Sequence, residues 1–241
     1  MSSIKVWDLP TRFFHWLLVF SFAGAFLTAE SERNRDLHVL LGYTVLGLIV
    51  FRLLWGLIGS RYARFSSFVC SPKVVVLYFC QLIQKQAQHP VGHNPVGAVV
   101  IVLLLLLGLG SGLSGWAVYE DIGADWLTEW HELISNAMLM VVCIHITGVV
   151  VSSYLQGVNL ITAMITGKKT GHVNQAISSN VTSLAWLLLA VVIGLWIWAW
   201  PVSKDLNWLL HTLLKVTGTD HGLKHLPIKA LRGLQPRDSR L

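Results

Sequence analysis

The stretch of sequence that decides the fold is WHELISNAMLMVVCIH, residues 130–145, in which two histidines stand in a mostly apolar segment. As a helix, this segment brings His131 and His145 to within about 40° of the same face and separates them by about 21 Å along the axis. Polar residues are costly to bury in a membrane, and this favours a functional role for both. Two ligands on one face at two depths are what a stack of two haems needs.

The composition is that of an integral membrane protein. Hydrophobic residues make up 54% of the 241 and charged residues only 12%, about half the charged fraction of a usual soluble domain. The apolar residues fall in five blocks, at 13–29, 39–59, 96–118, 133–155 and 181–201. Each block is close to the ~20 residues that a spanning helix needs.

Two shorter stretches, 73–85 and 206–216, have the pattern of interfacial helices. We therefore expect an all-α membrane protein with a four-helix transmembrane bundle that holds two haems. A fifth transmembrane helix and short interfacial helices complete the expected fold. The two-haem core occupies residues 1–170, and the fifth helix with a basic C-terminal tail occupies 171–241. The third helix is predicted to begin at Asn94-Pro95, an N-cap followed by a proline.

Several other classes of function lack support. Cys70, Cys80 and Cys143 show no CxxC or CxxCH spacing, so no disulfide framework, zinc site or covalent c-type haem is expected. The net charge of +6 comes mainly from short basic segments beside apolar blocks. This pattern is typical of a membrane protein and does not indicate a partner nucleic acid.

Charge in the connections predicts the orientation. Lysine and arginine occur before the first block, between the second and third blocks, and after the fourth. The connection between the third and fourth blocks contains acidic residues and no lysine or arginine. We therefore expect a multi-pass protein of the bacterial inner membrane, and the positive-inside rule places its N-terminus in the cytoplasm. The tail at 202–241 conflicts with this rule, because five spans put it outside although it is rich in lysine and arginine.

This topology pairs the four membrane histidines by depth. His38 begins the second helix and lies level with His131 near the outer surface, while His15 lies level with His145 nearer the cytoplasm. We expect the first pair to bind an outer haem b and the second pair an inner haem b, each through two histidines.

Two arginines are further candidates at the inner haem. Arg52 follows His38 by 14 residues, which puts it near the same face at the inner depth. An arginine there is costly unless it is paired. A haem propionate is the candidate partner of Arg52, with Arg12 as a second candidate; the alternative is that Arg52 snorkels to the surface. Glycines at 42, 108, 110, 112, 115 and 148 would let a flat macrocycle or a neighbouring helix approach.

Four segments carry a resemblance to a known family: VWDLPTRFFHWLL around His15, HVLLGY at His38, GHNPVGA before the third helix, and WHELISNAMLMVVCIH. Over about residues 4–170 the chain resembles the bacterial cytochrome b561 family, which includes the cytochrome b subunits of nickel-iron hydrogenases. The resemblance implies a four-helix core with two b haems, ligands on helices one, two and four, and electron exchange with quinone.

Two histidines per iron leave no open coordination position, which suits electron transfer. We expect transfer between the quinone pool and a periplasmic redox partner, either a c-type cytochrome or a hydrogenase-like enzyme. The sequence leaves open whether the chain is itself an enzyme and whether it forms a homodimer. One alternative is a self-contained superoxide:quinone oxidoreductase. Others are a haem-free proton-relay transporter and a haem-free scaffold, neither of which would absorb visible light.

Overall fold

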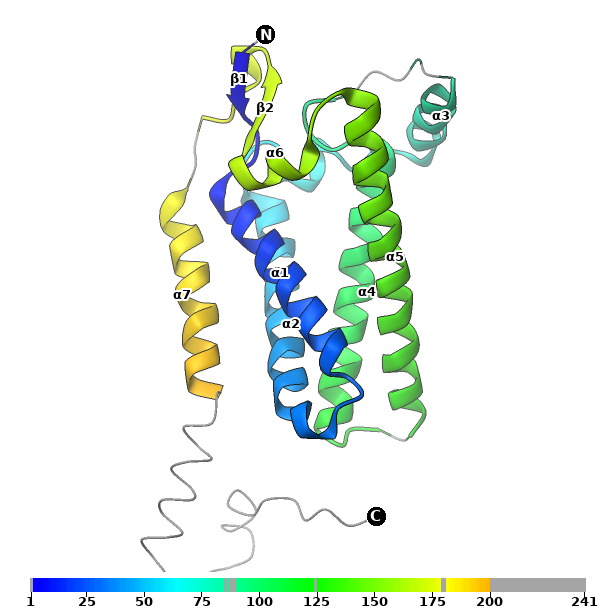
Figure 1. Cartoon of the computed structure of the whole chain (residues 1–241), viewed down its shortest axis with the longest axis vertical. Coiled ribbons are helices and arrows are strands. Elements are labelled where there is room, and N and C mark those ends of the chain that lie inside the picture. Colours follow the sequence, from blue (N-terminus) through cyan, green and yellow to red (C-terminus); the bar gives the residue numbers. More distant parts are fainter. Residues whose placement is uncertain (1, 85, 87–89, 124, 179–180, 200–241) are drawn as a thin grey trace, which may run out of the picture. The chain divides into compact units, whose positions relative to one another are not determined.

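The computed structural model describes residues 2–84, 86, 90–123, 125–178 and 181–199 (Figure 1). The chain divides into two units, Met1–Ala190 and Val191–Leu241. The first unit holds long helices and a small two-stranded sheet. Of the second unit, only the end of helix α7 (Thr182–Ala199) is described.

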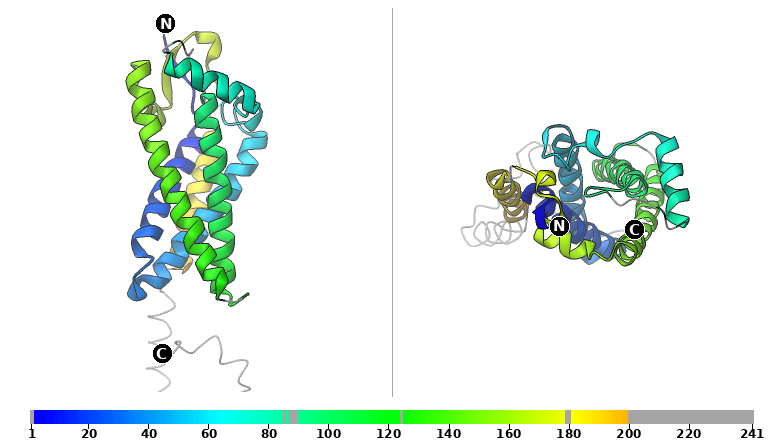
Figure 2. Two further views of the ribbon diagram at one scale, coloured as in Figure 1. Left: turned by 90° about the vertical axis from the view of Figure 1, so that its right-hand side faces the viewer. Right: turned by 90° about the horizontal axis from the view of Figure 1, so that it is seen from above.

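Four long helices dominate the first unit. They are α1 (Leu9–Thr28), α2 (Arg35–Ile58), α4 (Pro95–Tyr119) and α5 (Trp126–Gln156). Each of these segments is long and apolar enough to cross a membrane, where a helix pairs its own backbone groups. Helix α1 packs on α2, α2 on α4, and α4 on α5, and both views of Figure 2 show them side by side. The expected all-α membrane bundle is confirmed.

The helices begin and end at residues suited to those positions. Asn94 caps α4 by accepting a hydrogen bond from the Gly97 amide at 2.7 Å, with Pro95 at the first helical position, as predicted. Asp8 caps α1 in the same way. Helix α5 ends at Gly157, whose φ of +62° is the left-handed conformation that commonly terminates helices.

A small sheet lies at one end of the bundle. Strand β1 (Ser2–Lys5) pairs antiparallel with β2 (Lys168–Gly171), so that Ser2 lies opposite Gly171 and Lys5 opposite Lys168. Helices α3 (Pro72–Ile83) and α6 (Leu160–Thr166) lie at the same end (Figure 1). The short helical turns there are η2 (Phe65–Ser67) and η3 (Val173–Gln175). We call this end of the bundle the strand end.

The strand end has a core of its own. Ile4, Val6 and Trp7 pack with Ala163 of α6. Two backbone hydrogen bonds, from the amides of Val6 and Trp7 to the Gly167 carbonyl, tie the N-terminal segment to the end of α6. This small core joins the start of α1 to the segment that follows α5.

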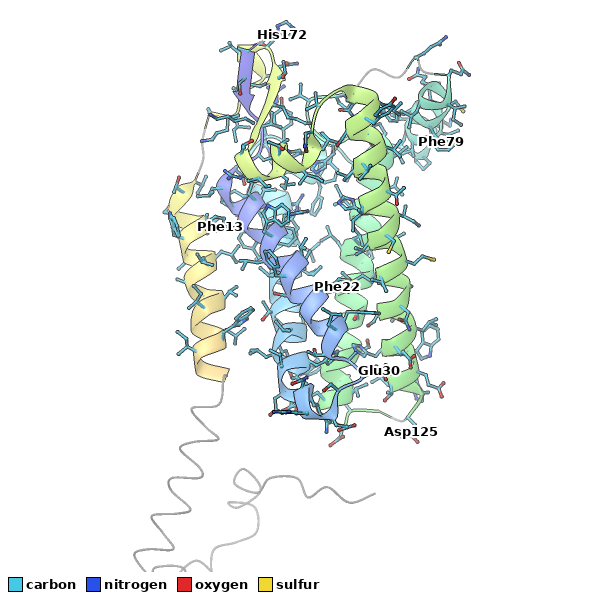
Figure 3. All side chains as sticks on the ribbon, in the orientation of Figure 1. Phe13, Phe22, Glu30, Phe79, Asp125 and His172 are labelled. Atoms are coloured by element: carbon cyan, nitrogen blue, oxygen red, sulfur yellow. The ribbon has the colours of Figure 1, made fainter. Side chains whose placement is uncertain are left out.

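The opposite end carries the acidic residues, and we call it the acidic end. It consists of η1 (Glu32–Asn34), the start of α2, and the connection between α4 and α5 with the start of α5. Figure 3 shows Glu30 and Asp125 at this end and His172 at the other. Its exposed carboxylates are Glu30, Glu32, Asp36, Glu120, Asp121, Asp125, Glu129 and Glu132. The basic residues of the strand end include Lys5, Arg61, Arg64, Lys73, Lys168 and Lys169, whereas the acidic end carries Arg33 and Arg35 among its carboxylates.

Two expectations for the remaining segments have different outcomes. A helix does form near 73–85, as α3, although its place at the membrane surface stays a prediction. The fifth apolar block corresponds to α7, whose apolar part, Thr182–Ile197, is shorter than the four spans. A fifth crossing therefore stays a prediction. The stretch 206–216 lies outside the described residues.

Candidate metal centre

The outer histidines face each other across the bundle. His38 lies in the first turn of α2 and His131 near the start of α5, both toward the acidic end. Their ring centroids are 6.2 Å apart, with the ring planes at 89°. A metal–imidazole bond of about 2.0 Å, with the ring centre about 1.1 Å beyond the nitrogen, puts two centroids about 6 Å apart across a shared metal. The separation of the predicted outer pair is therefore compatible with a metal ion between the two rings, and their joint ligation of a metal stays a prediction.

The second nitrogen of each outer ring is bonded to the backbone. His38 Nδ1 lies 2.8 Å from the Ala25 carbonyl oxygen, in the last turn of α1, where carbonyls lack helical partners. His131 Nδ1 lies 3.0 Å from the Ser111 carbonyl oxygen. Because a carbonyl only accepts, Nδ1 of both rings carries the hydrogen and donates it. The Nε2 atoms are then the ones that can bind a metal, which is the arrangement usual for ligand histidines.

Helix α4 supplies no predicted ligand but orients His131. Ser114 Oγ lies 3.2 Å from His131 Nδ1 and donates to the Ser111 carbonyl at 3.1 Å. The Ser111 and Ser135 hydroxyls are 2.7 Å apart and join α4 to α5. Sequence analysis missed these serines. The signal that could have found them is GLGSGLSG at 108–115, small and polar residues inside an apolar span.

The glycines separate into two groups. A Cβ atom at Gly108 would meet Ile49 Cδ1 at 2.7 Å, and one at Gly112 would meet Leu46 Cδ1 at 2.9 Å, so these glycines let α4 approach α2. In contrast, a Cβ at Gly42 or at Gly148 would meet nothing within 4 Å. These two follow His38 by four residues and His145 by three, so each shares a face with a histidine.

The inner histidines lie toward the strand end, but their rings are not in contact. His15 is half-buried beside Trp16, with ring centroids 5.1 Å apart, and its Nδ1 is buried with no hydrogen-bond partner in the described part of the chain. His15 and His145 are within electrostatic range of each other. The structure therefore brings both to the same half of the bundle, as expected, while their joint ligation of a metal stays a prediction.

The two arginines lie at the same half. Arg52 is only 3% exposed, with its guanidinium 5.0 Å from the Phe65 ring centroid, so it does not snorkel to the surface. Its Nη1 is buried without a hydrogen-bond partner among the described residues. Arg12 donates from Nη2 to the Ile165 carbonyl of α6, and its buried Nε has no such partner in the same set. Both arginines keep a buried donor for an anionic group, and their contact with a propionate stays a prediction.

His93 is a half-buried imidazole with a buried Nδ1, in the connection before α4, and it was not predicted as a site residue. Its ring lies between Trp7, at 4.6 Å between centroids, and Phe68, at 4.7 Å. Burial, followed by the positive charges of Arg52 and Lys169, lowers the pKa of His93 to about 3. The imidazole is therefore neutral at physiological pH. The available signal was its place in GHNPVGA, directly before the cap of α4.

The residues present fit a haem at the outer pair. No group of three or more histidine, cysteine or acidic side chains suited to a bare metal ion occurs in the described part of the chain. A haem iron takes four nitrogens from its macrocycle and only two axial ligands from the protein. Two imidazoles with ring centroids 6.2 Å apart, both with Nδ1 bonded to a carbonyl, and the open face at Gly42 are compatible with that need.

Comparisons with known proteins agree with this chemistry. The family model described as prokaryotic cytochrome b561 matches residues 6–167, which contain the four long helices and all four paired histidines. The "Probable Ni/Fe-hydrogenase B-type cytochrome subunit" of Rhizobium leguminosarum bv. viciae is 23% identical over 213 residues, covering 70% of this chain and 89% of that protein. No solved structure matches. The chain belongs to the prokaryotic cytochrome b561 family, and is thus a multi-pass membrane cytochrome that binds haem b and transfers electrons.

Proposed function

We propose that the chain binds two b haems and carries electrons between a periplasmic redox partner and the quinone pool. His38 and His131 ligate the outer haem, and His15 and His145 ligate the inner one. The observation that carries this proposal is the outer pair, with ring centroids 6.2 Å apart and both Nδ1 atoms bonded to backbone carbonyls.

The chemistry of the bound group is reversible one-electron reduction of its iron. Two histidines at each iron would leave no open coordination position, and this would exclude oxygen and other small ligands. The carbonyls of Ala25 and Ser111 fix the direction of each ring and make its Nε2 more basic. Arg52 and Arg12 provide buried donors for the propionates of the inner haem.

The partners follow from the two ends of the bundle. Under the positive-inside rule the basic strand end faces the cytoplasm of an inner membrane and the acidic end faces the periplasm. The relative from Rhizobium is a hydrogenase subunit by name, which supports a hydrogenase-like partner at the acidic end. A c-type cytochrome is the other candidate there. Quinone exchanges electrons with the inner haem.

The test is a reduced-minus-oxidised visible spectrum with pyridine haemochrome quantitation on detergent-purified protein. We expect two b haems per wild-type chain, and one haem lost or made labile in both His131→Ala and His145→Ala. His172→Ala, an exposed histidine at the strand end, is the matched control and should keep both. A colourless chain that was properly supplied with haem would refute the proposal and favour the proton-relay transporter.

The direction and the partner need a second measurement. A soluble quinone analogue should oxidise the reduced protein faster than the protein is oxidised in buffer without the quinone. A hydrogenase or a reduced c-type cytochrome should then reduce it again. If superoxide alone reduces it rapidly and neither protein does, the superoxide:quinone oxidoreductase is the correct function. The exposed carboxylates of the acidic end repel an anion, whereas the exposed Arg33 and Arg35 beside His38 attract one, so this measurement decides between the two functions.

A further inference from the structure

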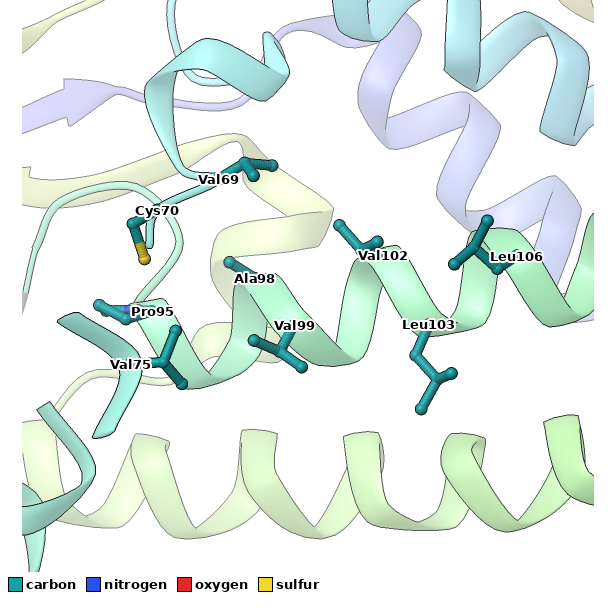
Figure 4. Close-up of a pocket in the computed structure, with 9 residues that line it drawn as sticks. All are labelled: Val69, Cys70, Val75, Pro95, Ala98, Val99, Val102, Leu103 and Leu106. Atoms are coloured by element: carbon teal, nitrogen blue, oxygen red, sulfur yellow. The ribbon is translucent and has the colours of Figure 1, made fainter. Parts of the chain in front are cut away.

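An apolar groove runs between α3 and the first turns of α4. It has a volume of about 320 Å³. Its lining, drawn in Figure 4, comprises Val69, Cys70, Val75, Pro95, Ala98, Val99, Val102, Leu103 and Leu106. The part along α4 extends from Pro95 to Leu106, which is about 16 Å of helix. The groove thus follows about three turns of α4, and its lining is apolar.

The position of the groove identifies the kind of molecule that can fill it. Helix α4 is one of the four segments apolar enough to span the membrane, so its side faces hydrocarbon. Val99, Leu103 and Leu106 line the groove and are exposed. A molecule dissolved in the bilayer, with a long flexible apolar chain, has the shape and chemistry to lie along them.

The segment that contributes Val69, Cys70 and Val75 to the groove is basic. The connection between α2 and α4 contains Arg61, Arg64, Lys73 and Lys85 and no acidic residue. Lys73 is the second residue of α3, is exposed, and lines a second hollow on that helix with Val76 and Leu77. Basic residues at a helix boundary attract anionic lipid headgroups by about 1 kcal/mol each, which is about fivefold in affinity.

We propose that this groove binds an anionic membrane phospholipid. One acyl chain lies along α4 between Val99 and Leu106, and the phosphate lies at Lys73 and Arg64. The bound lipid fills the space between α3 and α4 and so holds α3 against the bundle. This site is separate from the histidine pairs, and it does not depend on which partner exchanges electrons with the protein.

The test titrates delipidated, haem-loaded protein with palmitoyl-oleoyl phosphatidylglycerol or with the phosphatidylcholine of the same chains, and counts bound lipids by native mass spectrometry. We expect phosphatidylglycerol to bind about fivefold or more tightly, and Lys73→Gln to remove most of that preference. Val102→Trp fills the groove and should weaken both lipids tenfold or more. Leu113→Trp, an exposed position on α4 outside the groove, is the matched control and should bind as wild type does.

A second measurement covers the case in which Val102→Trp does not assemble, as judged from its haem spectrum. The double variant Cys80→Ser/Cys143→Ala leaves Cys70 as the only thiol, and Cys70 lines the groove. Phosphatidylglycerol should slow alkylation of Cys70 by a maleimide, and phosphatidylcholine should not. Equal binding of the two lipids, or an unprotected Cys70, overturns the proposal. So does a tightly bound quinone that the wild type retains and Val102→Trp loses, because the groove would then be a quinone-tail site.

Discussion

At the residue scale, the outer and inner histidines differ in how their rings are held. His38 and His131 each donate from Nδ1 to a backbone carbonyl, whereas His15 Nδ1 has no partner among the described residues. A ring whose Nδ1 is hydrogen-bonded to the backbone holds its Nε2 in one direction. The side chain therefore loses less conformational entropy when a metal binds. We therefore expect the outer site to hold its iron more firmly than the inner site.

Gly115 gives a sharp test of the outer site. A Cβ atom at this position would meet His131 Cε1 at 2.8 Å, so Gly115→Ala must displace the ring. We expect the variant to lose the outer haem or to hold it loosely, although alanine is the better helix former. Pyridine haemochrome content per chain measures the loss. Gly47→Ala on α2, where a Cβ would meet nothing within 4 Å, should keep full haem content. Full content in Gly115→Ala would contradict the assigned role of His131.

His93 predicts how stability depends on pH. The unfolded chain binds a proton on this imidazole below about pH 6.5, whereas burial keeps the folded side chain neutral down to a pKa of about 3. Between these values the unfolded state binds more protons, so the free energy of unfolding falls as the pH is lowered, on the order of 1 kcal/mol per pH unit at most. Thermal melts of detergent-solubilised His93→Gln should be flatter across this range than those of wild type. The exposed control His172→Gln should keep the wild-type slope, and an equal slope in His93→Gln would show that His93 does not carry the effect.

The sequence predicted that His38 lies level with His131, but not the groups that hydrogen-bond to their rings. The 14-residue spacing within α5 and the alternation of charge were enough to place His131 level with His38, and the structure brings these rings together. The stretch GLGSGLSG marks Ser111 and Ser114 as polar residues in an apolar span, but their contacts with His131 depend on which face of α4 packs against α5 and could not be predicted. The burial of His93 depends in the same way on Trp7, which is distant in sequence.

At the element scale, hydropathy predicted the four spans, and capping residues decide where the helices begin. The predicted start of α4 at Asn94-Pro95 is confirmed. The strands β1 and β2 were not predicted, because four residues carry little periodicity and their partners lie more than 160 residues apart. Strand pairing at such a distance is decided by the bundle, which brings the start of α1 close to the end of α5.

Asp8 links two of these helices. Its Oδ1 accepts from the Thr11 amide at 2.7 Å and caps α1, and its Oδ2 accepts from Trp55 Nε1 of α2 at 3.3 Å. Asp8→Ala removes the cap and leaves a buried indole N–H unpaired, so we expect a loss on the order of 2 kcal/mol in the free energy of unfolding. Asp8→Asn keeps an acceptor, so its free energy of unfolding should lie between those of wild type and Asp8→Ala. The measurement is the thermal midpoint of helix loss by circular dichroism.

The control for Asp8 is the N-cap of another helix. Asp125 occupies that position before α5 but makes no capping hydrogen bond through its side chain. Asp125→Ala should therefore melt close to wild type. If Asp125→Ala and Asp8→Ala lose the same stability, the contacts of Asp8 with Thr11 and Trp55 are not the cause.

At the scale of the whole molecule, the two ends of the bundle differ in charge. The described carboxylates lie at the acidic end, apart from the buried Asp8, while the strand end is basic. The histidine pairs follow the same axis, with His38 and His131 toward the acidic end. Orientation in the membrane therefore decides which pair faces the proposed periplasmic partner.

Labelling of single cysteines in spheroplasts tests this orientation. In a background without the three native cysteines, Glu129→Cys at the acidic end should react with a membrane-impermeant maleimide in intact spheroplasts. Ser3→Cys in β1 should react only after lysis, because the positive-inside rule puts the strand end in the cytoplasm. His172→Cys, also exposed at the strand end, should behave as Ser3→Cys does. The reverse pattern would exchange the inner and outer histidine pairs and place the redox partner at the strand end.

A reporter enzyme fused after Leu241 tests the fifth crossing. Periplasmic activity of the reporter requires a fifth crossing. Cytoplasmic activity means that the lysines and arginines after residue 201 obey the positive-inside rule, as the other connections do.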